Sequence, residues 1–244
     1  MNESIGRILI SFIFILCLVV SIYGQTVWEK KSYKQWTPTE VGQILNDSPW
    51  AQTQEDWGER TTNGHLNSFA AVIRLRSALP IRQAVVRQRM LVVNYDKLSA
   101  GDQSRFDAEV KQFLECSDCA SNYILTLGSP IMVFHNTSEG PNTSFDIVSR
   151  LKDLSLKDLK EYIYLANDKG ERRQLVYFIP PKKEGAEAMF VFPRFDEQGK
   201  PLLTSENKSF YFKIDEKVFE KRSVPLKRFS FDVSKLLRHG EVIF

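Results

Sequence analysis

Residues 209–214 read Ser-Phe-Tyr-Phe-Lys-Ile, so that Phe210, Phe212 and Ile214 occupy every second position. Because successive side chains of a strand point to opposite faces of a sheet, this period of two predicts a β-strand with one buried face. The same kind of stretch recurs, with turn-forming residues between the copies, at residues 161–166, 174–179, 187–193, 217–222, 227–233 and 241–244. Strands at this spacing predict an antiparallel β-sheet or a β-sandwich.

Earlier in the chain the apolar residues follow a helical period instead. Within residues 100–115 they recur at i, i+4, i+7 and i+8, the spacing of one helix face, which predicts a helix there. A second helix is predicted from Leu79-Pro80 to about Leu91, because proline is favoured in the first helical turn. Strands are predicted on either side of the two helices, at residues 66–76 and 122–127.

These elements run in the order β-α-α-β. The fold class predicted is therefore α+β, with a helical N-terminal half packed against the C-terminal antiparallel β-sheet or β-sandwich. Gly140-Pro141-Asn142 is a natural boundary between the two halves. We expect an N-terminal region at residues 25–140 and a β-rich region at residues 141–244, sharing one core.

Residues 1–24 combine a short polar start, an apolar run from Ile8 to Ile22 and a small residue, Gly24. This order is typical of a secretory signal peptide. The apolar run is shorter than the ~20 residues that a bilayer-spanning helix needs, which favours cleavage over an uncleaved membrane anchor. We therefore expect an exported protein, periplasmic or extracellular, with N-terminal membrane anchoring as the alternative.

The composition restricts the class of partner. The hydrophobic fraction of 43% and the charged fraction of 26% are ordinary for a soluble globular protein. The formal net charge is only +3, far from the strongly basic surface of a nucleic-acid binder. We therefore expect no nucleic-acid partner, and contact with a membrane only if the leader stays in place.

All four tryptophans lie in the stretch that follows the leader. Among them, Thr37-Pro38-Thr39-Glu40 supplies the N-cap, the first-turn proline and the acid of a capping box, which predicts a helix over residues 38–46. Trp36 and Trp50 flank this helix, and we expect them to fasten it to the core. The alternative is an exposed binding surface, to which Trp28, Trp36 and Trp50 would contribute.

Residues 60–95 contain six arginines and no acid. Two pairs share a face: Arg74 with Arg76 on the predicted strand, and Arg82 with Arg89 on the predicted helix. Such a group can form a binding patch for an anionic envelope polymer. The interpretation that we prefer is that these arginines pair with acids of the neighbouring helix.

Cys116 and Cys119 are the two cysteines that remain when Cys17 leaves with the leader. In an exported protein, an even pair predicts a disulfide. The alternatives are a thiol–disulfide redox pair and a metal site. The pair follows a predicted helix, at its electronegative end, and Glu115 and Asp118 are acidic, so both effects oppose a reactive thiolate.

No catalytic motif occurs in the sequence. The G-x-S-x-G and H-E-x-x-H patterns of hydrolases are absent, and so is a glycine-rich phosphate loop. His65, His135 and His239 stand alone, without the neighbours that metal or nucleophilic sites require. We therefore expect no cofactor, no metal and no catalytic residue.

Two segments carry a resemblance to other proteins. The first contains Trp36-Thr37, Glu40-Val41, Ile44-Leu45-Asn46 and Ser48-Pro49-Trp50-Ala51; the second contains Phe192-Pro193-Arg194, Gly199-Lys200-Pro201-Leu202, Phe231-Asp232-Val233, Lys235 and Gly240. In both segments the chain resembles uncharacterised secreted bacterial proteins, over about a quarter of its length. The resemblance implies export in a bacterium and adds no catalytic residue.

The function predicted from the sequence is that of an exported, non-enzymatic binding or interaction module. Its candidate partners are another envelope protein and an anionic envelope polymer. The first alternative is an envelope thiol–disulfide redox protein that uses Cys116 and Cys119, and the second is a hydrolase without a recognisable motif.

Overall fold

A computed structural model describes residues 27–60, 66–131, 148–183, 185–219, 228–238 and 241–242. The chain divides into two compact units, Met1–Trp36 and Thr37–Phe244. The predicted leader lies outside the described residues. Among the residues that are described, no helix has both the length and the apolar character needed to cross a bilayer.

In the first unit the structure describes two short helices, α2 (Val27–Lys30) and η2 (Tyr33–Gln35). The backbone N–H of Trp36 donates to Tyr33 O at 3.1 Å, which closes the η2 turn. The rings of these two residues meet edge to face with centroids 6.4 Å apart. Trp36 is fully buried.

The second unit begins with helix α3 (Pro38–Asn46), which the capping residues predict. Thr37 Oγ1 accepts the backbone N–H of Glu40, and Glu40 Oε2 accepts the backbone N–H of Thr37 at 2.7 Å. The two bonds satisfy N–H groups that have no partner within the helix. After the helix ends, Ser48 Oγ donates to Ile44 O at 2.8 Å and takes up one of its last carbonyls.

A five-stranded antiparallel sheet joins the two halves of the sequence. Its strands, in spatial order, are β1 (Ala51–Arg60), β2 (Leu66–Leu75), β3 (Asn122–Gly128), β7 (Ala188–Pro193) and β6 (Tyr177–Ile179). The sequence analysis missed β1, because its side chains are mostly polar and charged. The pairing of β3 with β7 brings N-terminal and C-terminal strands into one sheet.

A second antiparallel sheet has four strands, and residues 209–214, whose alternation predicts a strand, form one of them. In spatial order the strands are β5 (Arg172–Gln174), β4 (Ile163–Asn167), β8 (Ser209–Ile214) and β9 (Phe229–Asp232). The period of two is confirmed along β8, where half-buried and buried side chains alternate. A short ladder pairs β10 (Leu237–Arg238) with β11 (Glu241–Val242).

Aromatic rings pack the two sheets against each other. The ring of Phe190 in β7 lies 5.2 Å from that of Phe212 in β8, and Tyr123 in β3 stacks on Phe210 at 6.4 Å. These residues come from alternate positions of their strands, so each sheet contributes one face to a common core. The predicted α+β class with antiparallel C-terminal sheets is confirmed.

Two predicted helices are confirmed. They are α4 (Leu79–Val92) and α5 (Ala100–Glu115), joined by η3 (Tyr95–Lys97). Later in the chain the structure contains the turn η5 (Ser149–Leu151). Helix α6 (Leu156–Leu159) follows it, with Ser155 and Asp158 as its capping box.

Two predicted strands are wrong in part. Residues 174–179 were expected to form one strand, but β5 ends at Gln174 and β6 begins at Tyr177 in the other sheet, because the chain crosses between the sheets at Leu175-Val176. Residues 217–219 belong to the turn η6 (Glu216–Phe219), where Asp215 Oδ1 accepts the backbone N–H of Lys217. The remaining residues of the predicted strand at 217–222 lie outside the described part of the chain.

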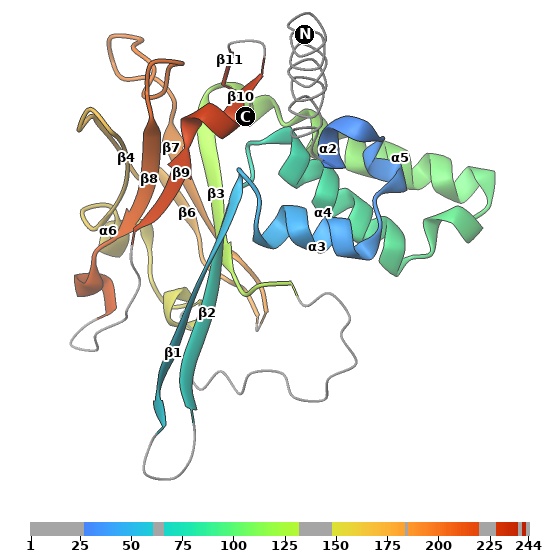
Figure 1. Ribbon diagram of the computed structural model, residues 1–244, viewed down its shortest axis with the longest axis horizontal. Coiled ribbons are helices and arrows are strands. Elements are labelled where there is room, and N and C mark those ends of the chain that lie inside the picture. Colours follow the sequence, from blue (N-terminus) through green and yellow to red (C-terminus); the bar gives the residue numbers. More distant parts are fainter. Residues whose placement is uncertain are drawn as a thin grey trace, which may run out of the picture. The chain divides into compact units, whose positions relative to one another are not determined.

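Helices α3, α4 and α5 gather on one side of β1–β3, and the four-stranded sheet lies on the other side (Figure 1). Arg74 and Arg76 point toward the helices, because Arg74 bonds to Leu45 O in α3 and Arg76 lies over the Phe113 ring of α5. The inner part of the five-stranded sheet is therefore covered on both faces.

Two glutamines of β1 close one side of the sandwich. Gln52 Oε1 accepts the backbone N–H of Ser230 at 3.2 Å, and Gln54 Nε2 donates to Arg228 O at 3.1 Å. Ser230 lies within β9, and Arg228 directly precedes that strand. Polar side chains thus occupy hydrogen-bonding groups that an outer strand would otherwise leave open.

Replacing Gln52 and Gln54 with alanine is expected to lower the free energy of unfolding by about 1 kcal/mol for each bond lost. The amide of Ser230 should also exchange its hydrogen faster, because its acceptor is gone. Hydrogen exchange read by mass spectrometry measures this, with Gln112→Ala on the exposed surface of α5 as the control. Unchanged exchange at Ser230 would show that the glutamines do not hold this edge.

Candidate functional site

The disulfide between Cys116 and Cys119 lies at the turn where α5 ends. Cys116 is the C-cap of α5 and has φ 46°, in the left-handed region that stops a helix. Residues Ser117–Ala120 then form the short helix η4, and Cys119 N–H donates to Cys116 O at 2.9 Å. Cys119 is only 5% exposed, whereas Cys116 is half-buried. The pairing that the sequence predicts is therefore present, and Cys119 is the more buried of the two cysteines.

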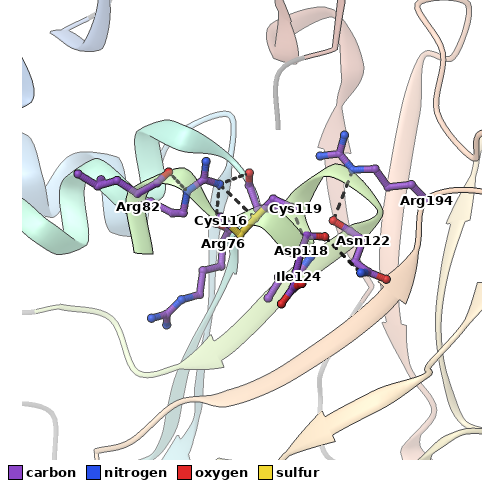
Figure 2. Close-up of a disulfide and its surroundings, with 10 residues drawn as sticks. Arg76, Arg82, Cys116, Asp118, Cys119, Asn122, Ile124 and Arg194 are labelled. Carbon is purple, nitrogen blue, oxygen red and sulfur yellow. Dashed lines mark hydrogen bonds between the residues drawn. A yellow bond between two sulfur atoms is a disulfide. The ribbon is translucent and has the colours of Figure 1, made fainter. Parts of the chain in front are cut away.

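The guanidinium of Arg82 contacts the sulfur of Cys119. Arg82 Nη1 lies 3.3 Å from Cys119 Sγ and donates also to Ser77 O, while Nε donates to Leu114 O at 3.0 Å (Figure 2). Arg82 is 5% exposed, and these acceptors are all uncharged. The buried guanidinium thus donates its hydrogen bonds to neutral carbonyl oxygens and to one sulfur of the disulfide.

The same region contains a second arginine, Arg194. It donates from Nε to Asn122 O at 3.4 Å, and its guanidinium lies 5.3 Å from the centre of the Tyr123 ring. Burial and, to a smaller extent, the charge of Arg194 together lower the pKa of Arg82 to about 10. Arg82 therefore remains protonated at neutral pH. Burial raises the pKa of Tyr123 to about 12, so its phenol is neutral.

The positive charge beside Cys119 has no signal in the sequence. The charged residues next to the cysteines along the chain are the acids Glu115 and Asp118, and both side chains are exposed in the structure. Arg82 is far from the cysteines in sequence and reaches Cys119 only because α4 and α5 pack together. No spacing of residues in the sequence indicates that Arg82 of α4 contacts the turn that follows α5.

Arg74 and Arg76 share one acidic partner. Both form ion pairs with Glu187, which lies directly before β7. Arg76 Nη1 lies 3.5 Å from Glu187 Oε2. Arg74, 2% exposed, also donates from Nε to Leu45 O at 2.6 Å and from Nη2 to Asn46 Oδ1 at 3.3 Å. Burial lowers the pKa of both arginines. The expected partners on helix α5 are thus replaced by an acid from the C-terminal half.

Arg89 behaves as the preferred interpretation predicted. Its Nη2 lies 2.6 Å from Glu109 Oε1 on α5, and both side chains are exposed. Its guanidinium also lies 5.3 Å from the centre of the Phe106 ring. The pair is a surface ion pair between two neighbouring helices.

The residues considered for a binding patch differ in their exposure to solvent. Arg82, Arg74, Trp36 and Trp50 are buried. The remaining three differ in exposure, since Arg89 is exposed while Arg76 and Trp28 are half-buried. The buried indole rings of Trp36 and Trp50 do not form part of an exposed surface.

The described residues contain neither a candidate metal-binding cluster nor any of the three histidines. No group of three or more His, Cys, Asp or Glu side chains able to hold a metal ion occurs in that part of the chain. His65, His135 and His239 all lie outside it. Among the described residues, we therefore regard the disulfide and the arginines around it as the candidate site for a chemical reaction.

No protein-family model matches the sequence, and no curated protein matches it. Among solved structures, the chain is similar to a protein of unknown function from Burkholderia pseudomallei. The two chains share 12% sequence identity with a TM-score of 0.37, over 68% of this chain and 72% of the other. The chain thus resembles a bacterial protein of unknown function, and no activity comes with the resemblance.

The Glu187→Ala variant is expected to lower the free energy of unfolding by about 3 kcal/mol, because it leaves the buried Arg74 without its counter-charge. The matched variant Glu109→Ala removes the exposed partner of Arg89 and should cost less than about 1 kcal/mol. Urea unfolding at constant m value measures both. Equal losses in the two variants would contradict the assignment of Arg74 as a buried anchor.

Loss of the disulfide has a separate, smaller effect. In the Cys116→Ser/Cys119→Ser variant, the free energy of unfolding should fall by about 2 kcal/mol, the chain-entropy value for so short a loop. Urea unfolding of this variant and of the oxidised protein gives the difference. No loss at all would mean that the turn after α5 is held by its other contacts alone.

Proposed function

We propose that this chain is an exported, non-enzymatic protein that binds another protein of the bacterial cell envelope. The surface proposed for this contact is an apolar strip on β3, β7 and β6. The strip consists of Ile124, Tyr177, Ile179, Met189 and Val191.

The register of the sheet places these five side chains on one face. Val191 pairs with Ile124 on one side and with Tyr177 on the other, and Met189 pairs with Ile179. Directly paired residues of neighbouring strands point to the same face of a sheet. Phe190 lies between Met189 and Val191 and packs on Phe212 in the core, so the strip points away from the sandwich.

The strip is open to solvent where the sheet ends. Tyr177 is 57% exposed, and the neighbouring Val176 is 49% exposed. Ile124, Ile179, Met189 and Val191 are half-buried. An apolar, aromatic-containing surface of this kind on a soluble protein supports a role in binding.

The position of the strip favours a polypeptide as its occupant. In the described part of the chain, β6 is the outermost strand of the five-stranded sheet. An extended segment of another protein can add a strand beside β6, with every second side chain apolar and directed onto the strip. An anionic polymer is a less favourable occupant, because two of the arginines that could bind it, Arg74 and Arg76, are already paired with Glu187.

Two further observations support the export of the protein. The leader-like residues 1–24 carry the order of segments typical of a signal peptide. The Cys116–Cys119 disulfide fits an oxidising compartment such as the periplasm or the extracellular space.

Photo-cross-linking in the native host tests this function. A photoreactive phenylalanine analogue is placed at Tyr177, and at the exposed Glu161 as the control position. We expect one discrete adduct with a different protein from position 177 and none from position 161. The adduct should disappear when Ile179→Glu is added, because a charge then lies in the strip.

Other outcomes overturn the proposal. An adduct at twice the mass of this chain would identify a second copy as the occupant. Adducts that persist with Ile179→Glu, or that are the same from both positions, would place binding elsewhere. The thermal midpoint of Ile179→Glu is measured alongside, to show that the variant remains folded.

A further inference from the structure

We infer that the Cys116–Cys119 disulfide is a thiol-exchange site, which accepts two electrons from a dithiol of another exported protein. In this reaction Cys116 is the sulfur that is attacked, and Cys119 is the leaving group, held by Arg82. The exchange is stoichiometric, one dithiol oxidised per chain, so it adds a redox step to the proposed non-enzymatic binding function and does not depend on the apolar strip.

The difference in burial between the two cysteines decides where an incoming thiolate can react. Cys116 is half-buried at the left-handed turn after α5, whereas Cys119 is 5% exposed. Thiol–disulfide exchange requires access to the sulfur that is attacked. The partner therefore reaches Cys116 Sγ, and the bond to Cys119 Sγ breaks.

Arg82 favours Cys119 as the leaving group. Its Nη1 lies 3.3 Å from Cys119 Sγ, and its other acceptors, the carbonyls of Arg76, Ser77 and Leu114, carry no charge. A thiolate on Cys119 would supply a counter-charge, and no acid of the described residues forms an ion pair with this guanidinium. Leaving groups of lower thiol pKa depart faster, and a stabilised reduced form makes a disulfide more oxidising.

The other charges around the disulfide reinforce this asymmetry. The C-terminal end of α5 carries partial negative charge and lies at Cys116, which is its C-cap. Arg194 lies close enough to Arg82 for its charge to lower the pKa of that guanidinium, so it adds positive potential on the Cys119 side. The acids nearest in sequence, Glu115 and Asp118, are exposed to solvent, where their fields are screened.

The reaction balances in two steps. A thiolate of the partner attacks Cys116 Sγ, forming a mixed disulfide, and the electron pair of the broken bond goes to Cys119 as a thiolate. The second thiolate of the partner then attacks the partner's own sulfur in the mixed disulfide, which releases Cys116. Cys116 takes up a proton from solvent. The partner leaves oxidised to its disulfide, and this chain keeps the two electrons.

The titration of Cys119 alone gives the first test. In a Cys17→Ser/Cys116→Ser background of the full chain, thiolate absorbance near 240 nm needs no reagent to reach the buried cysteine. We expect a thiol pKa below the ordinary cysteine value of about 8.5. Adding Arg82→Gln should raise this pKa by at least one unit, about a tenfold change in the ionisation constant.

The matched control is Arg105→Gln, which removes the same charge from an exposed position on α5. It should leave the pKa of Cys119 unchanged. Arg82→Lys keeps the charge and should restore most of the shift. Where Arg82→Gln fails to fold, Arg194→Gln is the second variant, and it should raise the pKa by a smaller amount.

The site of attack is tested with glutathione as the probe. The oxidised protein, carrying Cys17→Ser, is treated with glutathione and quenched with iodoacetamide, and fragment masses then locate the two labels. We expect glutathione on Cys116 and carbamidomethyl on Cys119. The equilibrium constant for reduction by a dithiol should fall at least tenfold in Arg82→Gln, equivalent to about 30 mV.

Three results would overturn the inference. They are glutathione on Cys119, no mixed disulfide at all, and a Cys119 pKa that Arg82→Gln does not change. Ile179→Glu separates the two proposals, because it disrupts the apolar strip and should leave every value at the disulfide as it is.

Discussion

The layer of phenylalanine rings between the two sheets determines which residues of the strands face outward in the second unit. Phe190 and Phe192 of β7 meet Phe212 of β8, and Phe210 stacks on Phe231 of β9 with ring centres 4.7 Å apart. Once these rings face inward, the period of two assigns every intervening residue to an outer face. The outward positions of β2 therefore carry Arg74 and Arg76, and those of β7 and β6 carry the apolar strip.

That outer face is covered in one region and open in another. Over β2 the helices pack against it, and the arginines there become buried or half-buried and pair with Glu187. Over β6 the apolar side chains are left partly exposed, Tyr177 most of all. One face of a single sheet thus carries both a structural anchor and the surface that we propose for binding.

The two most buried arginines near helix ends perform a common task. Arg74 donates to Leu45 O near the end of α3, and Arg82 donates to Leu114 O near the end of α5. Each cation takes up a carbonyl that has no partner within its helix and lies at the negative end of the helix dipole. They differ in their remaining contacts, because Arg74 has a carboxylate and Arg82 has a sulfur. Because of that difference, Arg74 stabilises the fold, and Arg82 is the residue that we propose to favour thiol exchange at Cys119.

Much of the fold follows from the sequence alone. Local rules determine α3 through Thr37 and Glu40, α5 through Ser99 and its helical period, and β8 through strict alternation. The Cys116–Cys119 pairing is also local, since only two residues separate the cysteines. These features depend on neighbours along the chain, so the sequence contains all the information that they need.

Only the tertiary structure decided which residues meet from distant parts of the chain. The strand β1 has no local signal, because its glutamines are suited to the edge of β9 rather than to an apolar core. Glu187 reaches Arg74 only when β7 pairs with β3, and Arg82 reaches Cys119 only when α4 packs against α5. Burial of a charge and its choice of partner depend on this three-dimensional packing, and no spacing of residues along the sequence encodes them.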